Sequence, residues 1–259
     1  MLAATRRDLL LERLRSDGRL VAKDLARELG LSEDSIRRDL RDLAAAGLCT
    51  RVYGGALPVS PATGDYAART TVATESKRRV AAHAASLITR GSTVILDGGT
   101  TTLELTRAIP TALECDIITH SPTIAAALLD HAASVYLIGG TLFKHSAVAT
   151  GAAAAEMAQR VSADLFFLGV VGIHADAGLT TGDAEEAAMK RLLASRAADT
   201  YVLGSSEKLG AAARHTIVPL AEVTAIIADP SDEADLDSLG RRTQVVRVER
   251  RSESRQRTP

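Results

Sequence analysis

The stretch Leu31 to Leu48, LSEDSIRRDLRDLAAAGL, has the pattern of a short helix with two unlike faces. On a 3.6-residue period its branched apolar side chains share one stripe, and its basic side chains share the opposite arc. Ser32 can cap the helix at its start, and Gly47 can end it in a left-handed conformation. The apolar residues are Ile36, Leu40 and Leu43, and the basic residues are Arg37, Arg38 and Arg41.

The segments on either side of this helix predict a winged helix-turn-helix. Val21 to Leu29 is a second amphipathic helix that Gly30 joins tightly to the next, and Arg6 to Asp17 has leucines at helical spacing. Arg51 to Leu57 contains a Gly-Gly turn that suits a short β-wing. By itself an arginine-bearing helix is usually a solvated surface, but these neighbours favour a DNA-reading helix.

A helix-turn-helix places its second helix in the major groove of double-stranded DNA. We therefore expect the exposed polar side chains of this helix to contact base edges or phosphates, and the wing to reach the backbone or the minor groove. Because such proteins commonly pair two half-sites, a homo-oligomer is expected. The DNA-contacting candidates are Ser35, Arg37, Arg38 and Arg41 on the helix, with Arg51 and Tyr53 on the wing.

The 259 residues are 46% hydrophobic, which is enough for one small and one medium-sized domain. The net charge of −1 argues neither for nor against a nucleic-acid partner. Cys49 and Cys115 have no metal-ligand spacing, which favours free thiols in a reducing compartment. No signal peptide or membrane span is recognisable, so a cytoplasmic protein is expected. The predicted divisions are a DNA-binding domain over 1–57, a linker over 58–73, a second domain over 74–248 and a disordered tail over 249–259.

The second domain alternates short apolar strands with helices, the pattern of an α/β fold on a largely parallel sheet. Its first helix is predicted from Glu75 to Thr89. The predicted strands span 93–96, 117–119, 135–138, 165–171, 201–203, 224–228 and 245–248, and the further helices span 101–109, 122–132, 151–160 and 184–198.

Three glycine- or serine-rich loops follow strands of this domain and could bind an anion. The first, from Asp97 to Thr102, leads into a helix whose N-terminus offers free N–H groups. The others, Gly178 to Lys190 and Leu203 to Lys208, each bring hydroxyls and a lysine. A Gly-Gly-Thr turn is also compatible with a plain turn, and a single lysine is usually solvated. Neither a P-loop nor a dinucleotide fingerprint is present, and no cofactor or metal is expected.

The run SDGRLVAKDLARELGLSEDSIRRDLRDLAAAGLCTRVYGGAL closely resembles the winged helix of DeoR-type transcription regulators. Residues from about Glu75 to Asp229 resemble the sensor domain of the same family, which is similar in fold to ribose-5-phosphate isomerase and CoA-transferase-like proteins. The resemblance implies a regulator, most often a repressor of a sugar operon, that responds to a phosphorylated sugar. The implied effector ligands are Asp97, Gly98, Gly99, Thr100, Thr101 and Thr102 at the phosphate, Lys190 and Lys208 as cations, and Asp183 at the sugar hydroxyls.

The sequence departs from the family pattern at two places. The family usually has aspartate where Gly204 stands, in an Asp-Ser-Ser-Lys run, whereas this chain reads Gly-Ser-Ser-Glu-Lys with one extra residue before the lysine. The family usually has asparagine where His120 stands. These departures leave the role of Lys208 open, and they leave His120 either as a ligand of the effector or as a satisfied core histidine.

Two rival functions each fit part of the sequence. A sugar-phosphate isomerase fused to a DNA-binding domain would need a carboxylate base, but Met189 stands where the related isomerases have glutamate before the lysine. An architectural, effector-independent DNA-binding protein would explain only the first domain. The sequence therefore favours a regulator without enzymatic activity, with double-stranded operator DNA and a phosphorylated sugar as its partners.

Overall fold

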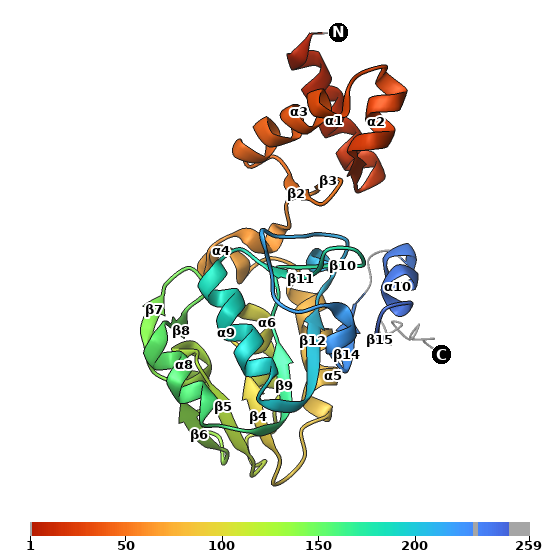
Figure 1. The fold of residues 1–259 in the computed structure, drawn as a ribbon. Helices are drawn as coiled ribbons and strands as arrows, with labels where there is room; N and C mark the ends of the chain where they lie inside the picture. Colours follow the sequence, from red (N-terminus) through yellow and green to blue (C-terminus); the bar gives the residue numbers. More distant parts are fainter. Residues whose placement is uncertain (1, 230–232, 249–259) are drawn as a thin grey trace, which may run out of the picture.

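The computed structural model describes residues 2–229 and 233–248, and its N-terminal part is a winged helix-turn-helix (Figure 1). Leu10, Ile36 and Leu40 from two of its helices are buried in a common core. Its elements are α1 (Ala3–Asp17), β1 (Leu20–Val21), α2 (Ala22–Leu29), α3 (Glu33–Ala45), β2 (Thr50–Val52) and β3 (Gly55–Leu57), with the strands in the order β1-β3-β2.

Helix α3 begins and ends where its sequence predicts. The Ser32 side chain accepts a hydrogen bond from the Ser35 backbone N–H at 3.2 Å, and Gly47 has a φ of 72° just beyond the last turn. One detail of the prediction was wrong, because Val21 is not part of the second helix. It lies in β1, where its pairing with Gly55 ties the helices to the wing.

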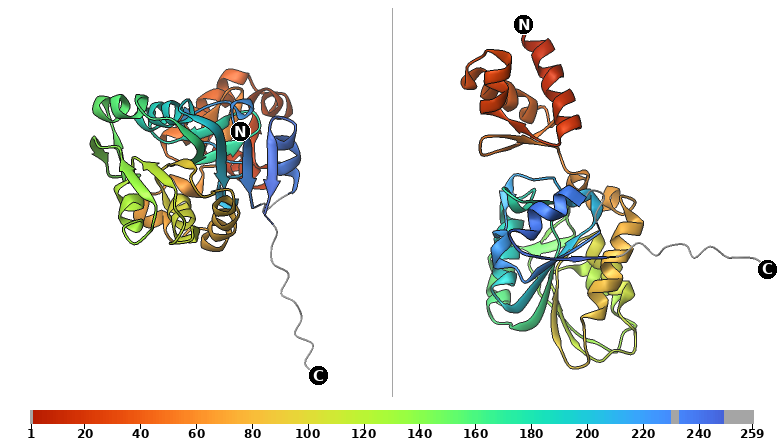
Figure 2. Two further views of the ribbon diagram at one scale, coloured as in Figure 1. Left: turned by 90° about the horizontal axis from the view of Figure 1, so that it is seen from below. Right: turned by 90° about the vertical axis from the view of Figure 1, so that its right-hand side faces the viewer.

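The larger domain is built on a seven-stranded parallel sheet in the order β15-β14-β12-β9-β4-β5-β6. Figure 2 shows the helices covering both faces. Strand alternation explains the two layers, because Ile95 packs in one apolar cluster while Val94 and Leu96 pack in the other. The strands are β4 (Thr93–Leu96), β5 (Asp116–Thr119), β6 (Ser134–Leu137), β9 (Ala163–Leu168), β12 (Ala197–Gly204), β14 (Ala225–Ala228) and β15 (Gln244–Arg247).

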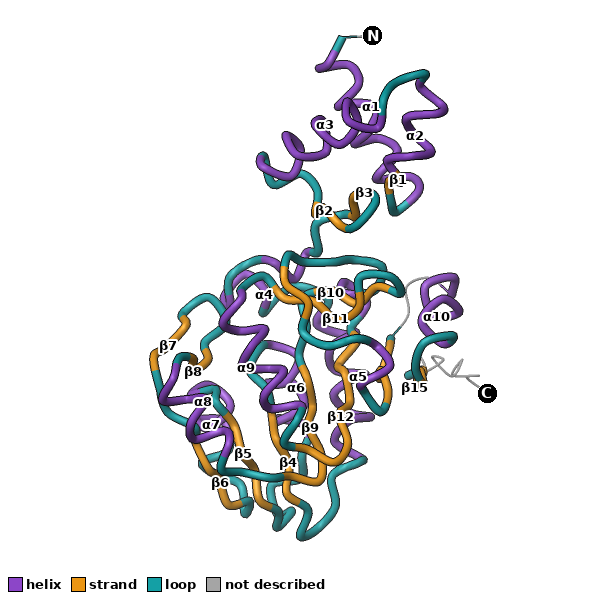
Figure 3. Tube along the Cα trace, in the orientation of Figure 1, coloured by secondary structure: helices purple, strands orange, loops and turns teal. Residues whose placement is uncertain are grey.

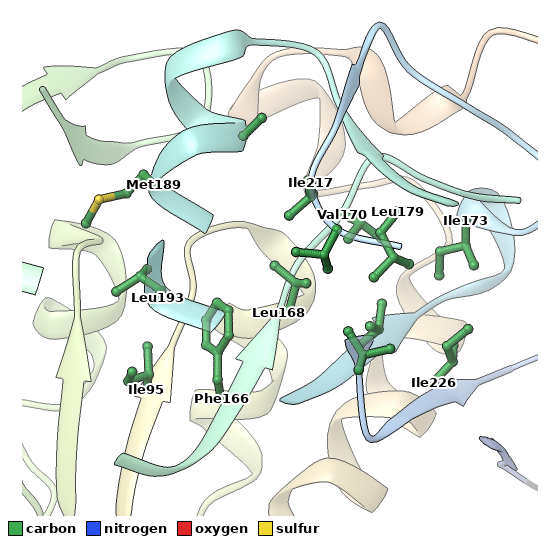
Figure 4. Packing of buried hydrophobic residues seen from close by; sticks show 14 of the residues in the cluster. Ile95, Phe166, Leu168, Val170, Ile173, Leu179, Met189, Leu193, Ile217 and Ile226 are labelled. Carbon is green, nitrogen blue, oxygen red and sulfur yellow. The ribbon is translucent and has the colours of Figure 1, made fainter. Parts of the chain in front are cut away.

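The helices divide between the two apolar clusters. The cluster that contains Phe166, Leu168 and Met189 lies beneath α8, α9 and α10 (Figure 4), and the other lies beneath α5, α6 and α7. The bounds are α5 (Thr74–Ser86), α6 (Thr100–Ala108), α7 (Pro122–Ala127), α8 (Ala152–Gln159), α9 (Ala184–Ala194) and α10 (Glu233–Gly240). The predicted fold class, a winged helix with an α/β domain, is thus confirmed.

Several predicted bounds were too long. The strand predicted over 165–171 ends at Leu168, because Gly169 turns its N–H toward a buried carboxylate. The helix predicted over 184–198 ends at Ala194, because the chain from Ala197 already pairs in the sheet as β12. The helix predicted over 122–132 ends at Ala127.

Several short elements of the larger domain were not predicted, and Figure 3 labels β7, β8, β10, β11 and α4 among them. They are too short for a periodic pattern to reveal them. They are β7 (Thr141–Phe143), β8 (Val148–Thr150), β10 (Gly172–His174), β11 (Gly178–Thr181), β13 (His215–Thr216), the short helix α4 (Tyr66–Arg69) and the 3-10 turns η1 (Pro61–Thr63), η2 (Ser206–Lys208) and η3 (Leu220–Glu222).

The segment 60–73, which was expected to be part of a linker, folds onto the larger domain. The Ser60 hydroxyl is fully buried and donates to the Val171 carbonyl at 2.7 Å, and Ala62 packs against Val171 and Ala213. The predicted tail, 249–259, lies outside the described residues. Across the described ranges, no helix has the length and apolar character needed to cross a bilayer.

Candidate functional site

The carboxyl ends of three neighbouring strands, β4, β9 and β12, meet beneath one pocket at the edge of the sheet. The loop after β4 leads into α6, and Gly99 precedes that helix with a φ of 111°, a conformation suited to glycine. A Cβ atom on Gly98 would lie 2.1 Å from the Val148 side chain. Within the described residues no side chain caps α6, and Gly99 to Thr102 line the pocket, so the positive end of the helix dipole lies beside it.

Asp97 lies beneath this loop and does not line the pocket. Its carboxylate is fully buried and accepts from the backbone N–H groups of Gly98 and Gly169, each at 2.8 Å. His120 Nε2 lies 2.9 Å away, and Lys190 Nζ donates to the other oxygen. Burial opposes ionisation, but Lys190 and His120 together hold the pKa of Asp97 far below its usual range. The carboxylate therefore anchors the loop from below.

Lys190 reaches the pocket wall from α9 but is already paired with carboxylates. Its ammonium donates to Asp97 and to the Gly169 carbonyl at 3.0 Å, and it lies 3.3 Å from Glu186 Oε1. The Thr181 hydroxyl donates to the second Glu186 oxygen at 2.8 Å. Burial lowers the pKa of Lys190, but the two carboxylates outweigh it and raise that pKa overall. Lys190 is thus a compensated cation.

Lys208 is a buried cation of a different kind. Its ammonium donates to the Thr101 hydroxyl at 2.8 Å and to the Leu203 carbonyl at 3.0 Å, and the residue is 4% exposed. Among the residues that the structure describes, no carboxylate oxygen lies within 4.0 Å of this ammonium. Burial, aided by the nearby cations and only partly opposed by Glu207, lowers the pKa of Lys208 to about 8. The N-terminus of α6 therefore has a charged neighbour that lacks an anion.

The segment 60–73 forms the roof of the pocket, to which it contributes Ala62, Arg69 and Val72. Arg69 at the end of α4 donates to the His145 carbonyl at 3.1 Å, and Lys77 Nζ donates to the Arg69 carbonyl at 2.6 Å. Sequence reasoning missed both residues, because neither follows a strand. The pocket is lined by Ala62, Arg69, Val72, Lys77, Gly98, Gly99, Thr100, Thr101, Thr102, Ser146, Gly169, Val170, Val171, Thr181, Glu186, Lys190, Glu207 and Lys208.

Two residues singled out from the sequence lie away from the pocket wall. Asp183 caps α9, where its carboxylate accepts from the Glu186 N–H at 3.0 Å. His120 is fully buried with both ring nitrogens engaged, one by Asp97 and one by the Ala149 carbonyl at 3.0 Å. His120 is therefore a satisfied core histidine.

The base position of the isomerase alternative also lies away from the pocket. Met189 is 4% exposed and packs in the apolar cluster of Figure 4, and it is not a lining residue. Within the described ranges no group of three or more potential metal ligands is brought together. Both cysteines are buried free thiols.

The predicted DNA-contacting side chains differ in their exposure and in whether they bond to another side chain. Arg38 and Arg41 are exposed, and in the described part of the chain they form no hydrogen bond or ion pair. Arg37 donates to Glu33 one turn earlier at 2.7 Å, and Ser35 is half-buried beside the cap, with its hydroxyl 3.0 Å from that of Ser32. The wing adds Arg51, which is exposed, and Tyr53, which is the most exposed large hydrophobic side chain among the described residues.

Two family models match this chain. A DeoR-like helix-turn-helix domain matches residues 6–62, and a DeoR C-terminal sensor domain matches residues 72–230. They fall on the stretches in which the sequence resembles DeoR-type regulators, so that prediction is confirmed.

Curated relatives cover most of the chain. It is 35% identical to the HTH-type transcriptional regulator GlpR of Haloferax volcanii, a match that covers 91% of this chain and 93% of the relative. It is 33% identical to a putative aga operon transcriptional repressor of Escherichia coli O157:H7, with 89% and 87% covered. These names are those of DNA-binding regulators, which supports the regulator over the isomerase alternative.

Solved structures match at low scores. Ribose 5-phosphate isomerase A from Methanocaldococcus jannaschii is 15% identical with a TM-score of 0.37, covering 50% of this chain and 51% of that one. The sorbitol operon regulator SorC from Klebsiella pneumoniae is 11% identical with a TM-score of 0.41, covering 91% and 98%. At these scores the likeness supports no inference about activity.

Proposed function

The chain belongs to the DeoR family of helix-turn-helix transcription regulators, and on that premise we propose that it represses a carbohydrate operon and responds to a phosphorylated sugar. The operator is double-stranded DNA, and the regulator acts as a homo-oligomer whose paired α3 helices read two half-sites.

Lys208 is the single observation that carries the phosphate proposal. A buried ammonium without a carboxylate is costly in free energy unless an anion joins it. It lies against Thr101 at the uncapped N-terminus of α6, where backbone N–H groups and the helix dipole favour negative charge. A phosphate dianion at this place would satisfy both groups.

The phosphate cradle comprises the turn from Gly99 to Thr102, the Lys208 ammonium and the Arg69 guanidinium from the roof. In this assignment Asp97 and Lys190 hold the turn in place and do not bind the phosphate themselves. Asp183 keeps its capping role. These assignments revise, within the proposal, the roles that the family resemblance implies for the three residues.

The roof gives effector binding a route to the DNA-binding domain. Arg69 belongs to the segment that connects α5 to the wing, so a phosphate that draws in its guanidinium also fixes that segment. Effector binding then changes the fraction of oligomers in which two winged helix-turn-helix domains have the spacing that the operator requires.

The phosphate site is tested by calorimetry with a panel of sugar phosphates on the full chain and on Lys208→Met. Methionine has similar length but no charge, so affinity should fall by about 10- to 100-fold, because a hydrogen bond to a charged group is lost. Arg90→Met, at an exposed arginine remote from the pocket, is the control. Unchanged affinity in Lys208→Met would overturn the assignment.

Coupling is tested by titrating the tightest sugar phosphate of that panel into an operator gel shift. Arg69→Gln should bind operator as the native chain does but need at least tenfold more effector for the same response. An equal effector requirement would refute the roof as the route. If sugar phosphate changed operator affinity in neither protein, the regulatory proposal itself would fail.

A further inference from the structure

Glu207 has one carboxylate oxygen without a partner. Its side chain is 5% exposed, yet within the described residues Oε2 is buried and makes no hydrogen bond. The other oxygen, Oε1, accepts from the Ser205 hydroxyl at 2.9 Å and lies 3.8 Å from Lys77 Nζ. A buried oxygen with unused acceptor capacity is unfavourable, and such exceptions call for a partner that the protein itself does not supply.

The groups around Glu207 place its carboxylate at the pocket that holds the proposed phosphate cradle. Lys77 and Glu207 both line that pocket. The Ser205 hydroxyl that donates to Oε1 lies 3.5 Å from the Thr101 hydroxyl, which in turn accepts from Lys208. One serine therefore separates the Glu207 carboxylate from the cradle, so a molecule bound in the cradle lies beside this carboxylate.

The chemistry of Oε2 specifies what that molecule presents. A carboxylate only accepts hydrogen bonds, and a phosphate dianion beside it would be repelled. The group that meets Oε2 must therefore be a hydrogen-bond donor. On a sugar phosphate, that donor is a hydroxyl.

We infer that Glu207 is the specificity-determining residue that accepts a hydrogen bond from a sugar hydroxyl of the effector. This inference rests on the phosphate site proposed above and names the second half of the ligand. It predicts that the protein discriminates polyhydroxylated phosphate esters from phosphate esters of similar size without hydroxyls. A site built to bond a hydroxyl rejects an analogue that lacks it, because the buried acceptor is then left unpaired.

The test is calorimetry on the full chain with glycerol 3-phosphate, ribose 5-phosphate and glucose 6-phosphate, compared with n-propyl phosphate and inorganic phosphate. The native chain should bind the tightest polyol phosphate about 10- to 100-fold more tightly than propyl phosphate. In Glu207→Ala this ratio should fall toward one. Propyl phosphate itself should bind at least as tightly as before, because a negative charge has been removed from the pocket.

The matched control is Glu222→Ala, which removes an exposed glutamate from another 3-10 turn, η3, and should keep the native ratio. Should Glu207→Ala not fold, Glu207→Gln replaces it. Glutamine could still donate to a sugar hydroxyl, so a Glu207→Met variant, which has similar length but no strong acceptor or donor, completes the test, and in it the ratio should again fall.

The outcomes separate the two proposals. A native ratio near one, or a Glu207 variant that keeps the native ratio, overturns the role of Glu207 while leaving the phosphate site intact. A native chain that binds no phosphate compound at all overturns the phosphate site.

Discussion

The cations of α3 and the cations of the pocket stand in opposite environments. Arg38 and Arg41 lie in solvent and pair with no other residue that the structure describes, whereas Lys190 and Lys208 are almost fully buried. An exposed arginine gives up little hydration until DNA arrives, so its effect is confined to binding. A buried lysine depends on its surroundings even in the free protein, so its network contributes to folding as well as to binding.

The largest effect should come from removing the anchor of the buried network. Among the described residues, Asp97→Asn would leave Lys190 with Glu186 as its remaining carboxylate partner. The cost should be about 3–5 kcal/mol in the free energy of unfolding, because the hydrogen bonds that Lys190 and the Gly169 N–H donate to the buried charged carboxylate, each worth about 1.5–3 kcal/mol, are weakened or lost. Urea unfolding measures the loss, with the exposed Asp130→Asn as the control. A loss below about 1 kcal/mol would mean that the network is not needed for stability.

The exposed arginines of α3 should show the reverse pattern, with a large effect on DNA binding and little effect on stability. Arg38→Ala should weaken operator binding by about 1–3 kcal/mol and leave the unfolding free energy within about 0.5 kcal/mol of native. Footprinting measures operator binding and thermal unfolding measures stability, and Arg160→Ala, at the residue that follows α8, serves as the control. A normal footprint with Arg38→Ala would show that Arg38 does not contribute to DNA binding.

Lys208 should make effector affinity depend on pH. Its free-state pKa of about 8 reflects burial and the cations Lys77, Arg69 and Lys190, partly offset by Glu207. A bound phosphate dianion raises that pKa, so affinity should fall above about pH 8, by up to about 1.4 kcal/mol per pH unit. Calorimetry from pH 7 to pH 9.5 measures the slope, and Lys208→Arg should flatten it. If the effector affinity of the native chain changed with pH no more than that of Lys208→Arg, the Lys208 ammonium would have no role in phosphate binding.

The same depressed pKa affects folding with the opposite sign. Between about 8 and the ordinary value of 10.5, the unfolded chain binds the proton that folded Lys208 has lost. The contribution of Lys208 to the free energy of unfolding therefore increases with pH across that window. Folding and effector binding thus respond oppositely to the same group.

The smallest effect concerns the start of α3. Ser32→Ala removes the side-chain cap and should cost about 1 kcal/mol of unfolding free energy. Because the hydroxyl of Ser35 lies against that of Ser32, the variant also frees Ser35. Thermal unfolding measures this loss of stability. If the variant instead changed operator preference without losing stability, Ser32 would be a DNA-contacting residue.

Elements with a strong periodic pattern can be predicted from the sequence. Features that depend on contacts between segments far apart in the chain cannot. The arginine arc of α3 and the strand over 93–96 are local patterns, and the structure has both. Asp97 was expected at the phosphate because it adjoins the glycine turn, yet its bonds to Gly169, His120 and Lys190 come from far along the chain. No local pattern could show that this carboxylate is already fully used.

The roof illustrates the same limit. The segment 60–73 is rich in proline, glycine and small polar residues, a composition typical of linkers. Its burial depends on Val171 and Ala213, more than a hundred residues later. Glu207 was seen only as a departure from a family run, and the significance of its free oxygen required the positions of Ser205 and Lys77.

The use of the interdomain connection as a roof has a kinetic consequence. Residues 60–73 cover part of the pocket, so opening of that segment would raise the rates of ligand entry and ligand escape together. Genes under such a regulator would change expression on the time scale of that opening after the metabolite level changes. Two sugar phosphates with equal affinity but different dissociation rates would then keep the operon in its effector-bound state of expression for different lengths of time.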